Sequence, residues 1–516
     1  MELSGWNFNP GQQGPVAARE EHVHGYHRKE FKDYYHWLRS GDEKTRQYLH
    51  SENVFSQAVL LSIRPLVGEI REELESFKGA KDDYPFAVGE YTYFDDKSQG
   101  LSNYTRATFG ERESVKDFNE FDASTVVGAF APSPYNDRVA YTIDPKGGGD
   151  YQLFIKDMCT KEEIMALDNI CENIIWSEEG DHLFYTTRDE HRNPFRLMRY
   201  SLADKRTHVV YSESSEGFRV EISQSTSKRY LFMNTESDTN NEIRFMDLRN
   251  PTSKLEVILP RQSGRLYYVE HHKKEFWFCT NHYKQAYKNF AVFKANIATP
   301  GKWSLAIPYN STEYITGMYG LRNAVALEVR VEGIQHIKII RNYLQHLVSF
   351  PEPVFHAKLA LKQLDYATKK IQIVYSSPIT PHSLMEYDLE TELKPLHQDS
   401  YPDYNPKLYS VERIYTNTGV PITLVYKKSL LDGSNPLLLE GYGGYGVNLE
   451  PNFQYQLPSL LNRGFIYAIA HVRGGSELGE QWYEQGKLLN KNNSFKDFAD
   501  MCPPPSVFET WFSHHR

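Results

Sequence analysis

A glycine-rich turn with two tyrosines is the part of the sequence whose residue types most suggest a binding site. It reads Gly-Tyr-Gly-Gly-Tyr-Gly over residues 441–446 and directly follows an apolar run of three leucines. Glycine lets the backbone turn sharply and pass close to a bound group. In open α/β sheets, ligands bind in turns at the carboxyl ends of strands. The same spacing also fits a tight strand-to-helix connection without chemistry, and the residues alone leave both interpretations open.

Histidines and cysteines are the other residues in this chain that could bind a metal. Residues 22–27, His-Val-His-Gly-Tyr-His, contain three histidines. No carboxylate or cysteine cluster completes this segment, so we interpret these side chains as solvated histidines and not as metal ligands. The four cysteines have no C-x-x-C spacing and predict neither a disulfide framework nor a zinc site. They are Cys159, Cys171, Cys279 and Cys502.

The elements around the glycine-rich turn predict a strand–helix–strand unit. The leucine run 437–439 is the first strand, and an apolar run over 465–470 is the second. Between them a short helix is expected over 457–463, with Pro458 in its first turn and Gly464 ending it. This order is typical of a βαβ unit, so we expect the two strands to be parallel in a buried sheet.

A repeat of β-rich phrases fills the chain from about residue 81 to 400. Successive phrases are 47, 44, 48, 45, 49 and 48 residues apart. A near-constant period in the forties with β composition is typical of a β-propeller with one four-stranded blade per repeat. Unrelated hairpins of a sandwich would show turns every 8 to 12 residues without the longer period. The sequence therefore predicts seven blades, marked by Thr92, Val139, Leu183, Leu231, Phe276, Val325 and Ile373.

Residues 1–80 are predicted to be helical after a loose start. Beyond Pro65, a set of apolar residues recurs at helical spacing on one face and indicates a helix. The set is Leu66, Ile70, Leu74 and Phe77. Near the other end of the chain, Ser494 with Asp497 three residues later predicts the N-terminal cap of another helix.

Composition and charge narrow the possible partners. The net charge of −9 gives no electrostatic reason to expect nucleic acid or an anionic membrane surface. No apolar run reaches the ~20 residues of a membrane span, and the first ten residues lack a signal-peptide core. Hydrophobic residues make up 40% and charged residues 24% of the chain, as in ordinary globular proteins. We expect a cytoplasmic protein.

Three motifs occur in the order found in one enzyme family. They are DYYHWL at 33–38, LLLEGYGGYG at 437–446, and the stretch 464–498, which begins GFIYAIAHVRGGSELGEQW. The chain resembles the prolyl oligopeptidase family of serine peptidases from about residue 20 to about 500, and within it oligopeptidase B. The resemblance implies a propeller over the mouth of an α/β-hydrolase domain, with the N-terminal helices packed on that domain. It also implies short peptides as substrates.

The resemblance gives the two tyrosines of the turn their roles. Tyr442 corresponds to the residue whose hydroxyl donates to the oxyanion of the tetrahedral intermediate. A tyrosine hydroxyl, with a pKa of ~10, stays protonated at neutral pH and can donate where negative charge develops. Tyr445 corresponds to an aromatic residue that lines the substrate pocket. Aromatic packing beneath the blades is the alternative for both residues.

The nucleophile that this family requires is missing from the sequence. The α/β-hydrolase fold carries it in a G-x-S-x-G turn, followed by an Asp and then a His, and no G-x-S-x-G occurs in the 516 residues. Residues 474–478 come nearest but have Leu in fifth place, so we expect Ser476 not to be catalytic. Ser513, His514 and His515 are adjacent at the chain end and do not have the spacing of a triad. The tail 501–516 departs from the family pattern, as a frameshift, a retained intron or an alternative exon would produce.

These observations predict four segments: helices of the hydrolase domain over 1–80, a seven-bladed propeller over 81–400, an incomplete α/β-hydrolase domain over 401–500, and an unrelated tail over 501–516. A serine oligopeptidase is the expected activity, with this chain inactive as it stands. The alternative is a non-catalytic propeller that binds peptides. No metal or organic cofactor is expected, because the chemistry needs only side chains and water. Proline and basic residues both remain candidates for the position before the scissile bond. With its sheet incomplete, the part beyond residue 400 is expected to aggregate.

Overall fold

The computed structural model describes residues 13–77, 84–281, 289–342, 344–389 and 393–501. The chain divides into two compact units. One unit contains residues 1–78 together with 455–463, and the other contains residues 79–454 and 464–516. None of the helices in the described ranges has the length and apolar character needed to cross a bilayer.

The first unit begins with a β-hairpin that the sequence analysis did not predict. Strand β1 (His22–Tyr26) pairs antiparallel with β2 (Lys29–Asp33). The two turn residues, His27 and Arg28, have φ angles of 48° and 63°. Such left-handed turns normally use Asn or Gly, so this turn carries no sequence signal. The sequence analysis expected only a loose start here, and the hairpin gives part of it regular structure.

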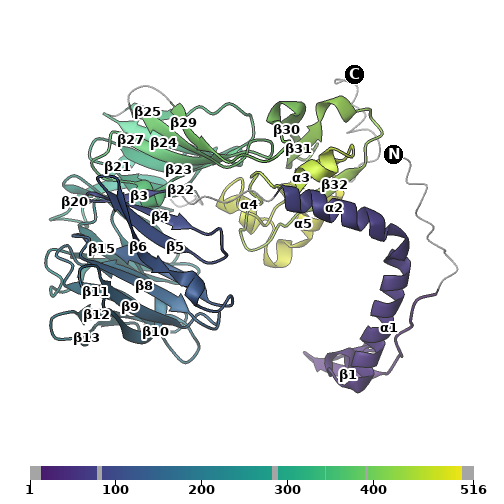
Figure 1. Cartoon of the computed structure of the whole chain (residues 1–516), viewed down its shortest axis with the longest axis horizontal. Helices are drawn as coiled ribbons and strands as arrows, with labels where there is room; N and C mark the ends of the chain where they lie inside the picture. The colour runs from purple at the N-terminus through teal and green to yellow at the C-terminus, as the bar shows by residue number, and fades with distance from the viewer. Residues whose placement is uncertain (1–12, 78–83, 282–288, 343, 390–392, 502–516) are drawn as a thin grey trace. The chain divides into compact units, whose positions relative to one another are not determined.

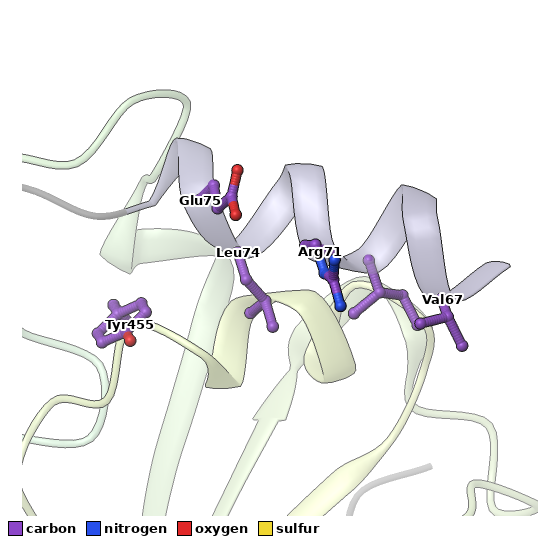
Figure 2. Close-up of a pocket in the computed structure, with 6 residues that line it drawn as sticks. Val67, Arg71, Leu74, Glu75 and Tyr455 are labelled. Carbon is purple, nitrogen blue, oxygen red and sulfur yellow. The ribbon is translucent and has the colours of Figure 1, made fainter. Parts of the chain in front are cut away.

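Helices follow the hairpin in the first unit. A 3-10 helix, η1 (His36–Arg39), precedes α1 (Glu43–Leu60), which is followed by α2 (Arg64–Ser76) and, from the later segment, α3 (Leu457–Leu461). The predicted helix beyond Pro65 is confirmed as α2. Glu73 of α2 joins it to the α3 segment by accepting hydrogen bonds from Arg463 (2.7 Å) and Ser459 (3.1 Å). Val67, Arg71 and Leu74 extend from the side of α2 on which Tyr455 lies, and they line a shallow pocket there (Figure 2).

Seven blades follow one another along the chain, coloured from dark blue to green in Figure 1. Three are separate four-stranded sheets, two share the long strand β10, and two are joined by the parallel pair of β24 and β26. The first three blades contain β3 (Phe86–Val88), β4 (Tyr91–Asp96), β5 (Asn103–Thr108), β6 (Glu111–Asp117), β7 (Val126–Pro132), β8 (Arg138–Asp144), β9 (Tyr151–Asp157), β10 (Glu163–Trp176), β11 (His182–Arg188), β12 (Pro194–Ser201) and β13 (Arg206–Ser212). The next two contain β14 (Arg219–Gln224), β15 (Tyr230–Glu236), β16 (Asn241–Asp247), β17 (Glu256–Val257), β18 (Tyr267–His272), β19 (Glu275–Thr280), β20 (Ala291–Asn296) and β21 (Ser304–Ile307). The last two contain β22 (Glu313–Gly320), β23 (Val325–Val331), β24 (Ile334–Arg341), β25 (Leu344–Leu347), β26 (His356–Leu359), β27 (Lys370–Ser376), β28 (Ser383–Asp388) and β29 (Leu393–Gln398).

The predicted propeller and its period are confirmed. The seven marker residues lie in β4, β8, β11, β15, β19, β23 and β27, and each of these is the second strand of its blade. The second strands are among the most deeply buried, as the pattern of β23 illustrates, where six of seven residues are buried. Burial of much of each strand favours β-branched, aromatic and other apolar residues there, which is why the repeat is visible in the sequence.

A four-stranded sheet follows the propeller. It contains β30 (Tyr409–Tyr415), β31 (Pro421–Lys427), β32 (Leu437–Gly441) and β33 (Ile466–Ala470), in the spatial order β30-β31-β33-β32. The predicted parallel pairing is confirmed, since β32 and β33 run parallel from Leu437 beside Ile466 to Gly441 beside Ala470. The expectation that both strands are buried was wrong for β32, because it is the terminal strand of this sheet among the described residues and is largely exposed. Two short helices, α4 (Glu480–Glu484) and α5 (Asn492–Ala499), come after β33.

Candidate active site

Two loops start side by side at the carboxyl ends of β32 and β33. Because these strands are parallel and in register, the glycine-rich turn 441–446 and the loop 471–479 leave the same edge of the sheet. The N–H of Gly446 donates to the carbonyl of Gly474 over 2.9 Å, and Gly446 and Gly475 form a parallel bridge. Such an edge is where open α/β sheets bind ligands.

Two glycines allow the backbones of these loops to touch. Gly443 has a φ of +62° and Gly474 a φ of +102°, both in the region that favours glycine. A Cβ atom on Gly474 would lie only 2.2 Å from the Gly443 carbonyl oxygen. The close approach fixes the glycine-rich turn against its neighbour, and any larger residue would force the two loops apart.

Residues at the start of α5 and within it form hydrogen bonds to both loops. The Lys491 ammonium, at its start, donates to the carbonyl of Gly443, and the Ser494 hydroxyl donates to the carbonyl of Arg473 over 2.5 Å. Asp497 is fully buried and accepts from the backbone N–H (3.0 Å) and the Nε–H (2.8 Å) of Arg473. The hydrogen bond to Asp497 raises the pKa of the Arg473 guanidinium. Ser494 therefore lies within α5 and does not cap it; the prediction of a cap was wrong because this hydroxyl bonds to another loop.

The two tyrosines of the turn are exposed. Tyr442 is 53% and Tyr445 is 88% accessible to solvent. Among the described residues, the Tyr442 hydroxyl has no hydrogen-bond partner, so its proton is available to a ligand. Tyr445 has a φ of +56°, which is rare for an aromatic residue and marks a constrained turn. Neither ring is packed into a core, and the roles of the two residues stay predictions.

A buried Thr–His–Glu group lies behind the loops, and the sequence analysis missed it. His471 Nε2 is 2.9 Å from the Thr423 hydroxyl, and His471 Nδ1 is 3.8 Å from Glu477 Oε1. The Thr423 oxygen also accepts from the Arg413 guanidinium at 2.9 Å. Burial, followed by the charge of Arg413, lowers the pKa of His471. All members of the group except Arg413 are less than 5% exposed, so it cannot reach a peptide.

The hydroxyl and the backbone N–H of Ser476 both form hydrogen bonds within the protein. Its hydroxyl donates to the Gly446 carbonyl over 2.8 Å, and its N–H donates to Asn448 Oδ1 over 2.8 Å. These bonds tie the loop 471–479 to the chain that follows the glycine-rich turn, and they agree with the expectation that Ser476 is not a nucleophile. The other rejected group, Ser513 to His515, lies outside the described residues.

A serine–histidine hydrogen bond occurs in the propeller, far along the chain from the loops. The Ser227 hydroxyl is 2.7 Å from His271 Nδ1, while His271 Nε2 is 2.6 Å from the Lys273 carbonyl. The carbonyl can only accept, so Nε2 carries the proton and Nδ1 accepts from the serine. Burial lowers the pKa of His271, whose side chain is almost inaccessible. The pair joins the β14–β15 turn to β18 and so connects two adjacent blades.

Comparison with known proteins identifies the family. A family model described as the prolyl oligopeptidase N-terminal β-propeller domain matches residues 15–400, and a second, the prolyl oligopeptidase family, matches residues 451–503. The chain belongs to the prolyl oligopeptidase family of serine peptidases. The second match includes the loop 471–479 and α5, so the family assignment covers part of the site as well as the blades.

Individual relatives place the chain close to oligopeptidase B within the family. Protease 2 of Moraxella lacunata is 31% identical over 515 residues, covering 94% of this chain and 74% of that protein. Oligopeptidase B from Leishmania major has a similar structure, with a TM-score of 0.83, 25% identity, and coverage of 95% of this chain and 76% of that one. Oligopeptidase B from Trypanosoma brucei, in a closed form with covalently bound antipain, gives a TM-score of 0.81 at 27% identity with the same coverage.

Proposed function

We propose that this protein is a serine oligopeptidase that acts on short peptides, and that the 516-residue chain binds peptide without hydrolysing it. In this proposal Tyr442 donates to the oxyanion and Tyr445 contacts the substrate. Membership of the family supports the activity class. The observation that carries the site assignment is the exposed Tyr442 hydroxyl, free of partners among the described residues, at the carboxyl edge of the parallel strands.

The chemistry assigned to Tyr442 follows from the state of its hydroxyl. In acyl transfer a nucleophile attacks the peptide carbonyl, and the carbonyl oxygen becomes negatively charged in the tetrahedral intermediate. A phenol with its proton in place donates to this oxygen without first losing another hydrogen bond. The loop contacts of Gly443 and Gly474 hold the turn that carries it, so little reorganisation is needed as the charge develops.

Inactivity of the chain itself is proposed from its sequence and supported by the environment of its serines. The sequence contains no G-x-S-x-G, and the hydroxyl of Ser476 already donates to a backbone carbonyl. In a peptidase of this chemistry, loss of the nucleophile alone costs on the order of 10⁶ in kcat. Covalently bound antipain in the Trypanosoma brucei relative supports a nucleophilic mechanism for the family member as a whole.

Experiments on the purified chain test the proposal that it does not hydrolyse peptides. We expect no labelling by a fluorophosphonate probe and no hydrolysis above the buffer rate of chromogenic peptides with proline, arginine or lysine before the scissile bond. A denatured sample provides the background for labelling. Stoichiometric labelling of one serine, with turnover that the probe abolishes, would overturn the proposal of inactivity.

The coding sequence tests the proposal that the protein is a serine oligopeptidase. Reading it beyond the codon for Asp500 in all three frames should reveal a G-x-S-x-G followed by an Asp and a His. In a protein that includes them, Tyr442→Phe should lower kcat about 10²–10³-fold with little change in KM, as for loss of one oxyanion donor. Tyr445→Ala should instead act mainly on KM. If no frame encodes this motif, the oligopeptidase proposal is wrong.

If no reading frame encodes the motif, we propose instead that the chain is a non-catalytic peptide-binding module. Its test is fluorescence polarisation with a labelled short peptide, in which Tyr445→Ala weakens binding and Tyr442→Phe leaves it nearly unchanged.

We further propose a cytoplasmic location, which is supported by free thiols at Cys159, Cys171 and Cys279. Cell fractionation with a cytoplasmic marker tests this location.

A further inference from the structure

Three histidines and one aspartate come together where the N-terminal hairpin meets η1. His22 and His24 lie two residues apart in β1, so their side chains leave the same face of the strand. His36 begins η1 and brings a third imidazole to them. One ligand atom from each of the three side chains can be chosen so that all lie within 4.8 Å of one another. Asp33 ends β2 directly opposite His22.

The carboxylate that the sequence analysis found missing is supplied by Asp33. Its Oδ2 lies 3.6 Å from His24 Nε2 and 3.8 Å from His36 Nδ1. Its Oδ1 accepts from the N–H of Tyr35 at 2.9 Å, which fixes the carboxylate and lowers its pKa. In a tetrahedral site with metal–ligand bonds of ~2.0–2.1 Å, neighbouring ligand atoms are about 3.3–3.4 Å apart. The two separations between the carboxylate and the imidazoles exceed this by a few tenths of an ångström. The three histidine ligand atoms, within 4.8 Å of one another, must move closer together to share one ion.

The three imidazole rings are packed against one another. The ring centroids of His22 and His36 are 3.7 Å apart and stacked, with His24 edge-on to both at 4.6 and 4.7 Å. The Nδ1 atom of His36 is buried and has no hydrogen-bond partner among the described residues. Imidazole nitrogens are suitable ligands for a borderline metal ion.

The backbone around the cluster is held by contacts to α1, near whose start the hairpin lies (Figure 1). Trp37, next to His36, donates from Nε1 to the Ala18 carbonyl at 2.8 Å, and its own carbonyl accepts from the Thr45 hydroxyl at 3.1 Å. The Trp37 ring also packs edge-on against Tyr48 of α1. The backbone that carries His36 is therefore held before any ion arrives, and binding requires only side-chain movement, which reduces its ordering cost.

We propose that His22, His24 and His36, with Asp33 supplying negative charge, form a binding site for a borderline divalent transition-metal ion such as Zn²⁺. The two stacked rings cannot both direct lone pairs at one ion, so binding requires one of them to rotate about its side-chain torsions. The side chains of His24 and His36 are 29% and 31% exposed, which leaves room for that movement. The ion would connect β1 to η1 and so has a structural role.

Metal binding by the 516-residue protein, prepared without a polyhistidine tag and stripped with a chelator, tests this inference. Equilibrium dialysis and calorimetry with Zn²⁺ should give one equivalent bound. Co²⁺ should give the visible absorption bands of a four-coordinate ion. His36→Gln and His22→Gln should each weaken binding more than about 100-fold, and Asp33→Asn about 10–100-fold.

Matched variants make the result decisive. His50→Gln removes an exposed histidine from α1, and a His514→Gln/His515→Gln double variant removes the pair near the chain end; both should bind as the unmodified protein does. Far-UV circular dichroism checks that each variant is folded. Because the His22 side chain is exposed, His22→Gln is the substitution expected to disturb the fold least. The inference is wrong if the unmodified protein binds no Zn²⁺, or if both His22→Gln and His36→Gln retain full affinity.

Discussion

At the scale of single residues, the buried carboxyl of Glu270 shows how a blade junction depends on protonation. Glu270 Oε1 accepts from the N–H of His271 at 2.6 Å, and its Oε2 is 3.0 Å from the Thr226 hydroxyl. Burial raises its pKa to about 8, against an ordinary value of 4.5. The folded protein therefore keeps a proton on Glu270 at neutral pH, while its carboxyl oxygens accept from the Thr226 hydroxyl and N–H.

Glu270→Gln should remove this dependence, because glutamine reproduces the protonated carboxyl at every pH. Between pH 4.5 and about 8 the folded state holds a proton that the unfolded state has released, so the free energy of unfolding falls as pH rises. The loss is at most about 1.4 kcal/mol per pH unit. Urea midpoints of the two proteins should coincide near the low end of this range and diverge towards its high end, with the variant more stable. If the urea midpoints of the two proteins differ by the same amount at every pH, the raised pKa assigned to Glu270 is wrong.

At the scale of elements, the candidate site depends on two loops whose backbones touch. The hydrogen bonds from Gly446 to Gly474 and from α5 to both loops fix the turn with its tyrosines at one edge of the sheet. The rigidity comes from backbone packing and not from the tyrosines, which are exposed. Substitutions at the glycines should therefore be far more severe than substitutions at the rings.

Gly474→Ala should disrupt the loop pair, and Gly444→Ala is its matched control. The new methyl group at residue 474 would lie 2.2 Å from a backbone oxygen at a φ of +102°, whereas at residue 444 the nearest atom is 3.7 Å away. We expect a loss of about 2–4 kcal/mol for the first variant and little for the second. Urea denaturation measures the loss, and limited proteolysis reports opening between residues 440 and 480. Equal effects from both variants would refute the close approach.

At the scale of the whole molecule, one buried ion pair ties the propeller to the segment that follows the glycine-rich turn. Arg330 of β23, whose side chain is 5% exposed, makes hydrogen bonds to both carboxylate oxygens of Glu450. Burial raises the pKa of Glu450, but the charge and hydrogen bonds of Arg330 outweigh it and leave the pKa below its ordinary value. The pair's contribution to stability is therefore present above pH 4.5 and is lost as the carboxylate is protonated at lower pH.

Arg330→Met should cost about 3–5 kcal/mol, because it leaves the Glu450 carboxylate buried without its partner. Adding Glu450→Gln to it should recover part of the loss, so the double-mutant cycle gives a favourable coupling. Arg249→Met is the control; its ion pair with Asp247 is more exposed, with 48% of the arginine side chain accessible, and should contribute no more than about 1 kcal/mol. Additive effects of the two principal substitutions would show that the pair is not coupled.

Strand β32 presents an exposed apolar edge of the last sheet, and we expect this edge to promote self-association. Strand β32 is the terminal strand of that sheet among the described residues, and its Leu437 and Leu438 are 36% and 42% exposed. An exposed apolar edge favours association between chains. Leu438→Lys should reduce self-association measured by sedimentation velocity, whereas Leu489→Lys, at a fully exposed leucine outside the sheet, should not. A monomeric unmodified protein at all concentrations would contradict this prediction.

Features that depend on short-range pattern could be predicted from the sequence. The seven blade markers all fell in second strands, and β32 and β33 were predicted as parallel strands around the helix α3. Runs of apolar residues marked these strands, and turn residues marked their ends. For β33 the run reflects complete burial, whereas β32 is apolar although it is largely exposed. The glycine-rich turn was found in the same way, whereas the roles of Tyr442 and Tyr445 came from family resemblance.

Contacts between distant parts of the chain were decided only by the tertiary structure. The hairpin over residues 22–33 was missed because its turn residues carry no glycine or asparagine signal. The histidine segment could not be judged from its own residues, since Asp33 and His36 reach it only through that hairpin and η1. Likewise, Ser494 looked like a helix cap until packing placed its hydroxyl against another loop. Local periodicity reports which residues are buried, but the partner of a polar group depends on how the elements pack together.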